Sequence, residues 1–160
     1  MSPATANLCD AYPHDLQIVA PIFSDYGGVR AFSGLISTVK VFEDNVLLRT
    51  ALEEPGAGRV LVVDGGGSLR CALIGDQIAT LAQQNGWQGI IINGAIRDVN
   101  TLEKIAIGIK ALAACPLKSA KNGWGQRDVA IKFGEVTFQP GAWLAADRDG
   151  IVVSAIALFC

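Results

Sequence analysis

The sequence "RVLVVDGGGSLRCALIGDQIA", residues 59–79, predicts the central unit of the fold. It opens at 59–64 with a short, continuous apolar run, the pattern of a strand buried on both faces. After three glycines a helix is predicted over 75–85, and Gly86 supplies its C-terminal stop. A second buried strand is predicted at 89–96. Strand, helix and strand in this order predict a right-handed βαβ unit with parallel strands.

The glycine run at 65–67 resembles a phosphate-binding loop, but its spacing excludes the two common kinds. A P-loop requires Gly-Lys followed by Ser or Thr, and the chain has no such triplet. A dinucleotide fingerprint that starts at Gly65 requires glycine at position 70, where Arg70 stands. The run is therefore either a flexible strand-to-helix connection or a place where backbone approaches an anion closely.

Three charged residues, Asp76, Arg97 and Asp98, are predicted to meet at one edge of the sheet. The helix over 75–85 rises about 1.5 Å per residue away from that edge. The strand over 89–96 returns to it at about 3.3 Å per residue. This edge is the carboxyl end of the strands, where α/β proteins usually bind ligands.

The chemistry of these residues suits a metal-chelated α-keto acid. Asp76 and Asp98 supply oxygen ligands for Mg²⁺ or Mn²⁺, and Arg97 can hold a carboxylate through two parallel hydrogen bonds. An ion pair between Arg97 and either aspartate, which would only tie helix to strand, is the alternative, and spacing does not decide between them. The first helical turn offers backbone N–H groups to an anion; they belong to Gly75, Asp76, Gln77 and Ile78.

The rest of the chain alternates helices with strands and then becomes rich in strands. Helices are predicted at 4–12, 45–54 and 99–105, strands at 33–42 and 108–116, a loop at 118–128 and a hairpin turn at 147–150. This order predicts one domain over 1–160, an α/β fold with a mixed sheet.

The composition excludes several function classes and predicts self-association. Apolar residues make up 51% of the 160 residues and charged residues 18%, with a net charge of −2, so a basic footprint for nucleic acid is absent. So apolar a composition predicts a homo-oligomer. The most apolar stretch, 105–117, is too short for a membrane span. No signal peptide and four scattered cysteines predict a cytoplasmic protein with reduced thiols.

Together, "RVLVVDGGGSLRCALIGDQIA" and "GIIINGAIRDV" resemble the regulator of ribonuclease activity A (RraA) family. That family includes class II, metal-dependent 4-hydroxy-4-methyl-2-oxoglutarate aldolases. Asp76, twenty intervening residues and the pair Arg97–Asp98 match the D-x20-R-D motif of its catalytic members. The similarity extends from "CDAYP" at 9–13 to "VTFQPGAWLAADRDGIVVS" at 136–154.

The resemblance implies a compact α/β/α sandwich, similar to the swivelling phosphohistidine domain, assembled as a homotrimer with its site near a subunit interface. It implies that Asp98 ligates a divalent metal ion and that Asp76 holds the ion through water. It also implies that Arg97 binds the keto-acid substrate and stabilises its enolate. The backbone amides of 75–78 would receive the pyruvyl carboxylate.

The implied activity is that of a lyase, which cleaves an aldol to pyruvate and decarboxylates oxaloacetate through the same pyruvate enolate. Two departures from the longer aldolases affect the expected general base. The chain stops at Cys160, without their C-terminal extension, and Arg49 stands where they tend to have a histidine. The alternative is a non-catalytic regulator that binds ribonuclease E. Methyltransfer, a label sometimes attached to the family, is a weaker interpretation because no glycine motif here recommends an adenosyl cofactor.

Several other residues have a structural and a functional interpretation. His14 is expected at the surface, with a proton carrier as the alternative. Glu43 and Asp44 are expected to cap a helix, and the alternative makes one of them a proton acceptor for a neighbouring subunit. The remaining candidates are expected to be structural: core or interface for Trp87, Trp124 and Trp143, and a turn for Asp147 and Asp149.

Overall fold

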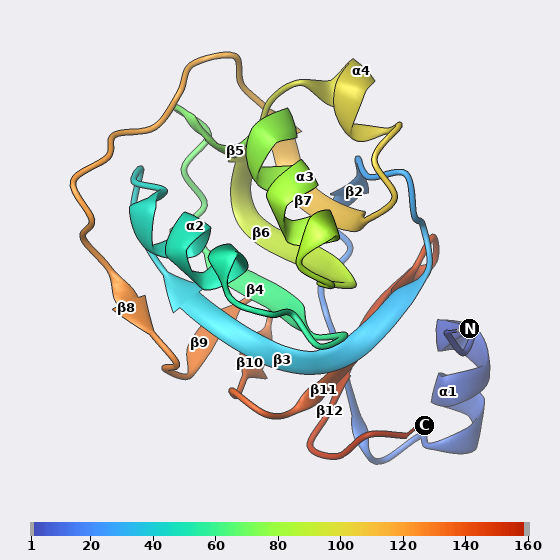
Figure 1. The fold of residues 1–160 in the computed structure, drawn as a ribbon. Coiled ribbons are helices and arrows are strands. Elements are labelled where there is room, and N and C mark those ends of the chain that lie inside the picture. The colour runs from blue at the N-terminus through green and yellow to red at the C-terminus, as the bar shows by residue number, and fades with distance from the viewer. Residues whose placement is uncertain (1, 159–160) are drawn as a thin grey trace.

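The computed structural model describes residues 2–158, which fold around one large mixed sheet (Figure 1). The helices are α1 (Thr5–Ala11), α2 (Val46–Glu53), α3 (Asp76–Gln84) and α4 (Val99–Leu102). The sheet contains β1 (Leu16–Ile18), β2 (Ser24–Asp25), β3 (Phe32–Lys40), β4 (Val60–Asp64), β5 (Ala72–Ile74), β6 (Gly89–Ile96), β7 (Gly108–Ala114), β8 (Gln126–Arg127), β11 (Trp143–Asp147) and β12 (Gly150–Ser154). A separate hairpin is formed by β9 (Ile131–Phe133) and β10 (Val136–Phe138).

The strands of the main path follow the order β1-β12-β11-β3-β4-β6-β7-β2. The central strands β3, β4, β6 and β7 are parallel to one another. Antiparallel strands flank them: β11, β12 and β1 on one side and β2 on the other. Because parallel strands end at the same edge of a sheet, the segments that follow β3, β4 and β6 lie together there.

The sheet has a hydrophobic core on each face. On one face α2 and α3 cover the central strands (Figure 1), and Leu48, Leu52 and Ala79 of the helices join one buried cluster with strand residues such as Leu61 and Ile92. The opposite face carries a second cluster, which the β9–β10 hairpin and the curled β11–β12 strands complete. Removal of these side chains from water supplies the main stabilisation of the fold.

Phe32 at the start of β3 explains two glycines in neighbouring strands. A Cβ at Gly89 or at Gly108 would collide with the Phe32 ring, which is buried against both. The strands therefore need glycine at these positions for close approach, and not for an unusual backbone conformation.

The predicted mixed α/β fold is confirmed, and most predicted elements are present within one to three residues of their expected ends. Short strands such as β1 and β5, of three residues each, are not predicted from the sequence, and β5 bears on the site because it lies between the glycine run and α3. No helix within residues 2–158 is long and apolar enough to cross a membrane. Three of the cysteines, Cys9, Cys71 and Cys115, are free, and Cys160 lies outside the described residues.

Candidate functional site

The site is built at the point where β5, α3 and β6 meet. The first part of β6 pairs with β4, with Asp64 opposite Asn93, and its last residues pair with β5, with Ile74 opposite Ile96. The short strand β5 therefore continues the line of β4 along β6. The N–H of Arg97 donates to the carbonyl of Ile74 at 3.0 Å, which ties the end of β6 to the residues that lead into α3.

The two predicted carboxylates lie beside each other at this junction. Asp98 Oδ2 accepts a hydrogen bond of 2.9 Å from the backbone N–H of Asp76, the first residue of α3. Asp98 itself adopts a left-handed backbone conformation, with φ of 64°, and precedes α4. Gly75 makes the approach possible, because a Cβ at this position would collide with the Asp98 carboxylate. The N–H groups of Gln77 and Ile78 lie in the same first turn, where a helix has no internal acceptors for them.

Arg97 lines the same pocket, and it is not in an ion pair with either aspartate. Among the ion pairs within residues 2–158, none includes Arg97, Asp76 or Asp98. In the described part of the chain, its side chain makes one hydrogen bond, a long one of 3.4 Å from Nη1 to the Pro116 carbonyl. The alternative in which Arg97 serves only as a helix-to-strand ion pair is therefore wrong, and its guanidinium remains free to bind an anion.

These residues enclose a small pocket of about 140 Å³. Four side chains that carry positive charge line it, against two carboxylates, Asp76 and Asp98. Arg49 and Arg97 are two of the four, and Lys118 and Lys121 are the others. Sequence reasoning noted Arg49 only as a departure from a family pattern and did not single out the two lysines. Buried Asn45 completes the floor, donating from Nδ2 to the Leu73 carbonyl at 3.1 Å.

Asp44 holds the loop that carries both lysines. It is only 2% exposed, and its carboxylate accepts hydrogen bonds from the backbone N–H groups of Val46, Asn122 and Gly123 at 2.6–3.2 Å. Burial alone would raise the pKa of Asp44, but these N–H donors outweigh burial and lower its pKa. Asp44 therefore binds the first N–H group of α2, although the N-cap residue itself is Asn45, and it also fixes the loop after Lys118. A proton-accepting role does not suit a carboxylate with so many donors.

Glu43 links the start of α2 to the loop after the glycine run. It accepts hydrogen bonds from Ser68 Oγ at 2.6 Å and from Arg70 Nε at 2.7 Å, and these two donors lower the pKa of Glu43. The glycine run itself does not line the pocket of Asp98. Gly66 instead borders a separate cavity of about 540 Å³, together with exposed Trp124. The interpretation of the run as part of the anion site is therefore wrong.

The donor set of the pocket fits a hard divalent ion. Nowhere in residues 2–158 do three or more His, Cys, Asp or Glu side chains gather as a metal-binding group. An ion at this site would thus have Asp98 and Asp76 as its protein carboxylates, and water for the rest. Mg²⁺ is commonly held in this way, by one or two carboxylates and several waters.

Comparison with known proteins gives the pocket its context. The family model described as RraA-like, Aldolase/RraA, matches residues 5–153. The chain belongs to this family. A relative from Alkalilimnicola ehrlichii, 53% identical over 99% of this chain and 98% of its own length, is provisionally named 4-hydroxy-4-methyl-2-oxoglutarate aldolase.

Two solved structures are closely similar but carry different names. A protein from Geobacillus kaustophilus, described as S-adenosylmethionine:2-dimethylmenaquinone methyltransferase, is 51% identical with a TM-score of 0.96, over 98% of this chain and 97% of that one. A Thermus thermophilus protein, described as the RNA-processing inhibitor RraA, is 45% identical with a TM-score of 0.95, over 99% and 96%. The three names describe three activities on one fold, so the function has to be argued from the residues of the pocket and not from the fold.

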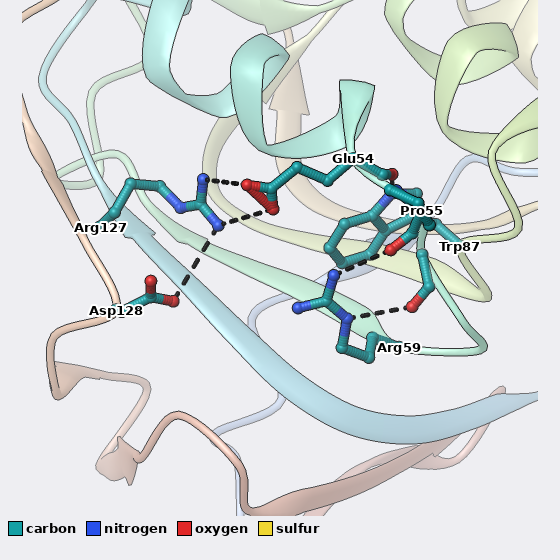
Figure 2. Close-up of polar contacts among 7 residues, drawn as sticks. Glu54, Pro55, Arg59, Trp87, Arg127 and Asp128 are labelled. Atoms are coloured by element: carbon teal, nitrogen blue, oxygen red, sulfur yellow. Dashed lines mark hydrogen bonds and ion pairs between the residues drawn. The ribbon is translucent and has the colours of Figure 1, made fainter.

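The tryptophans divide between core and surface. Trp143 is buried, whereas Trp124 is 75% exposed beside the larger cavity. Trp87 is buried after α3, where its Nε1 donates to the Glu54 carbonyl at 3.1 Å. Figure 2 shows the guanidinium of Arg59 over the Trp87 ring, 4.6 Å from its centre. This cluster pins the end of α2 and lies outside the residues that line the pocket.

Two further expectations concern the ends of the fold. His14 lies in an exposed turn after α1, as expected for a surface residue. Asp147 closes the β11–β12 hairpin by accepting from the N–H of Asp149 at 3.0 Å, and it also anchors the start of α1 through Thr5. Asp147 and Asp149 therefore form a turn, as expected.

Proposed function

We propose that this chain is a divalent-metal-dependent carbon–carbon lyase that forms a pyruvate enolate. Its reaction would be cleavage of 4-hydroxy-4-methyl-2-oxoglutarate, and oxaloacetate decarboxylation would accompany it. The observation that carries the proposal is the meeting of Asp76, Asp98 and an unpaired Arg97 in one pocket at a helix N-terminus. Homologues more than 50% identical over nearly the whole chain bear the aldolase name.

Each residue of the pocket has a part in the proposed reaction. Asp98 would hold the metal ion directly and Asp76 through water. When bound, the ion supplies Lewis-acid stabilisation of the enolate. The N–H groups of Gln77 and Ile78 would receive the pyruvyl carboxylate at the positive end of α3. Arg97 would place a fixed positive charge beside the oxygen on which negative charge develops.

The two reactions differ only in the group that leaves. In the aldol cleavage the C3–C4 bond breaks, its electron pair stays with the pyruvyl half as an enolate, and the C4 hydroxyl loses its proton. In the decarboxylation the same bond releases CO₂. The enolate then takes a proton at C3 and becomes pyruvate. The chain needs no Schiff-base lysine for either reaction, because the charge is stabilised without covalent attachment.

Assembly, metal and location complete the proposal. The exposed apolar side chains near this edge of the sheet, Phe42, Leu117 and Trp124, support association into a homotrimer. The oxygen-only donor set supports Mg²⁺ or Mn²⁺. A cytoplasmic location agrees with the free thiols of Cys9, Cys71 and Cys115.

Docking on ribonuclease E is the second candidate function, and the close likeness to the RNA-processing inhibitor from Thermus supports it. Such docking requires a surface and not the acidic pocket, so the two functions can coexist. Methyl transfer to a menaquinone precursor has less support. The pocket that contains Asp76, Arg97 and Asp98 has about 140 Å³, which is small beside the roughly 300 Å³ or more typical of cofactor sites, and the larger cavity of about 540 Å³ contains none of these three residues.

Steady-state decarboxylation of oxaloacetate tests the proposed lyase. Purified protein is assayed with Mg²⁺, with Mn²⁺ and with excess EDTA, beside the variants Arg97→Ala and Asp98→Ala. We expect metal-dependent turnover that EDTA abolishes and that each variant lowers by about 100-fold or more, since each removes charge stabilisation of the transition state. Background rates from folded native protein with metal would overturn the lyase and leave docking as the leading account.

A further inference from the structure

The candidate pocket holds more positive charge than the pyruvyl half of a substrate can use. Its four cationic side chains exceed its two carboxylates before any metal ion is counted. In the proposed reaction the pyruvyl carboxylate is received by the first turn of α3 and the enolate oxygen by Arg97. Arg49 also has a partner, Glu53, at 3.7 Å along α2. Lys118 and Lys121 are left without a role.

Neither lysine is neutralised by a carboxylate. Within residues 2–158 no ion pair includes Lys118 or Lys121. The ammonium group of Lys121 makes one hydrogen bond, 3.2 Å to Asn45 Oδ1, and an ammonium has three N–H donors. Two donors therefore remain for a ligand.

The loop that carries the lysines is held in place, although both of their side chains are exposed. Asn45 is 7% exposed and is itself fixed to the Leu73 carbonyl beside β5, so the contact of Lys121 is anchored in the floor of the pocket. Lys118 is fixed through its backbone, which forms a β-bridge with Ala72. The loop between the lysines is bound to the start of α2, because the N–H of Ala120 donates to the Glu43 carbonyl at 3.0 Å. Because the loop and the contact of Lys121 are already fixed, less entropy is lost when these cations bind an anion than when a flexible loop does.

We propose that Lys118 and Lys121 bind a carboxylate on the non-pyruvyl half of the substrate. They would make the enzyme selective for aldols that carry a second carboxylate, over aldols made from neutral aldehydes. The inference rests on the proposed lyase function and adds to it the residues that determine specificity. The two lysines touch no reacting bond, so they contribute to substrate selection and not to enolate formation.

The test compares substrates that differ in the distal arm. The dicarboxylates are the aldols 4-hydroxy-2-oxoglutarate and 4-hydroxy-4-methyl-2-oxoglutarate, whose second carboxylate stays intact, and 4-hydroxy-2-oxopentanoate has a neutral methyl arm. The variants are Lys118→Met, Lys121→Met and the double variant, with Lys132→Met on β9, which lies outside the pocket, as the matched control. A second readout is exchange of the pyruvate methyl protons with deuterium, followed by NMR, because pyruvate has only the carboxylate that α3 receives.

We expect kcat/KM for the dicarboxylates to fall by about 10- to 100-fold in each lysine variant, as for loss of a charge-assisted hydrogen bond. The losses for 4-hydroxy-2-oxopentanoate and for pyruvate exchange should be much smaller, and Lys132→Met should behave like the native protein. Added salt should weaken the native preference for dicarboxylates, since the contact is ionic.

Equal losses for all substrates, or no loss for the dicarboxylates, would overturn the role of the lysines. The double variant's far-ultraviolet circular dichroism and urea unfolding establish that it is folded. Absence of pyruvate exchange in native protein with metal would instead overturn the lyase function itself, so the two failures are distinguishable.

Discussion

Substitution of Gly75 by alanine tests whether the close approach of α3 to the end of β6 sets the geometry of the site. The backbone at Gly75 is extended, with φ of −136°, so alanine causes no strain in the main chain itself. Its Cβ would collide with Asp98 Oδ2 and come within 3.3 Å of Arg97 Cγ. Carbon atoms make ordinary contacts at about 3.5 Å or more, so the Asp98 carboxylate must withdraw by about 1 Å.

This displacement predicts a large loss of activity with a small loss of stability. A shift of about 1 Å at a catalytic group costs on the order of 100-fold in rate. The hydrogen bond from the Asp76 N–H to Asp98 is also lost, at about 1.5–3 kcal/mol for a charged acceptor. Replacement of glycine restricts the unfolded chain and returns about 0.4–1 kcal/mol. The net fall in unfolding free energy is therefore about 1–2 kcal/mol.

The assay measures kcat/KM for oxaloacetate decarboxylation and, separately, urea unfolding. Gly94→Ala is the matched control, because its added Cβ meets side-chain carbons of Ile92 and Leu73 at 3.4 Å and the Ser68 carbonyl oxygen at 3.6 Å, which are ordinary contacts. We expect that control to keep kcat/KM within about twofold of native, as for a side chain added without displacement. If Gly75→Ala kept native kcat/KM, the position of Asp98 against α3 would not matter for the chemistry.

Three further predictions concern the surroundings of the site. Asp44→Asn should lower the unfolding free energy at pH 7 by about 1–3 kcal/mol. The pKa of Asp44 is lowered in the folded protein, so its contribution to stability is present above about pH 4 and is lost as the pH falls through the folded pKa. The unfolding free energies of native protein and variant, measured in urea, should therefore converge in acid. Parallel pH curves for the two proteins would contradict this. Arg127→Gln removes the two 3.3 Å contacts to half-exposed Glu54 (Figure 2). It should lower the unfolding free energy by at most about 1 kcal/mol and leave the decarboxylation rate unchanged. A slower rate would connect this ion pair to the pocket. Because Cys71 and the other described cysteines are free, a reductant should not move the thermal midpoint, and a fall in midpoint would reveal a disulfide.

The convergence of Asp76, Arg97 and Asp98 follows from the sequence because the rise of a helix and the rise of a strand are fixed by backbone geometry. The sequence nevertheless predicts no strand between the glycine run at 65–67 and the helix at 75–85. The insertion of β5 moves the start of α3 along β6, from the level of Asp64 to the level of Ile74. A three-residue strand has too few residues for a periodic signal. Without β5, the glycine run at 65–67 is expected beside the start of α3, although it borders a different cavity.

The lysine-bearing loop illustrates a different limit of sequence reasoning. The stretch from Lys118 to Asp128 is polar and contains two glycines, so its composition indicates an ordinary surface loop. Its position depends on Asp44, more than seventy residues earlier, whose carboxylate accepts hydrogen bonds from backbone N–H groups of the loop. Every residue type except proline has such a group, so the sequence of the loop does not reveal the contact. No pairing of side chain types marks such a contact. The part of the pocket proposed to face the pyruvyl group is thus encoded in one continuous βαβ segment, whereas the part proposed to face the rest of the substrate comes from a distant loop. Because the two parts are separately encoded, we expect substitutions at Lys118 and Lys121 to change substrate selectivity while leaving the proposed enolate chemistry of Arg97 and Asp98 in place.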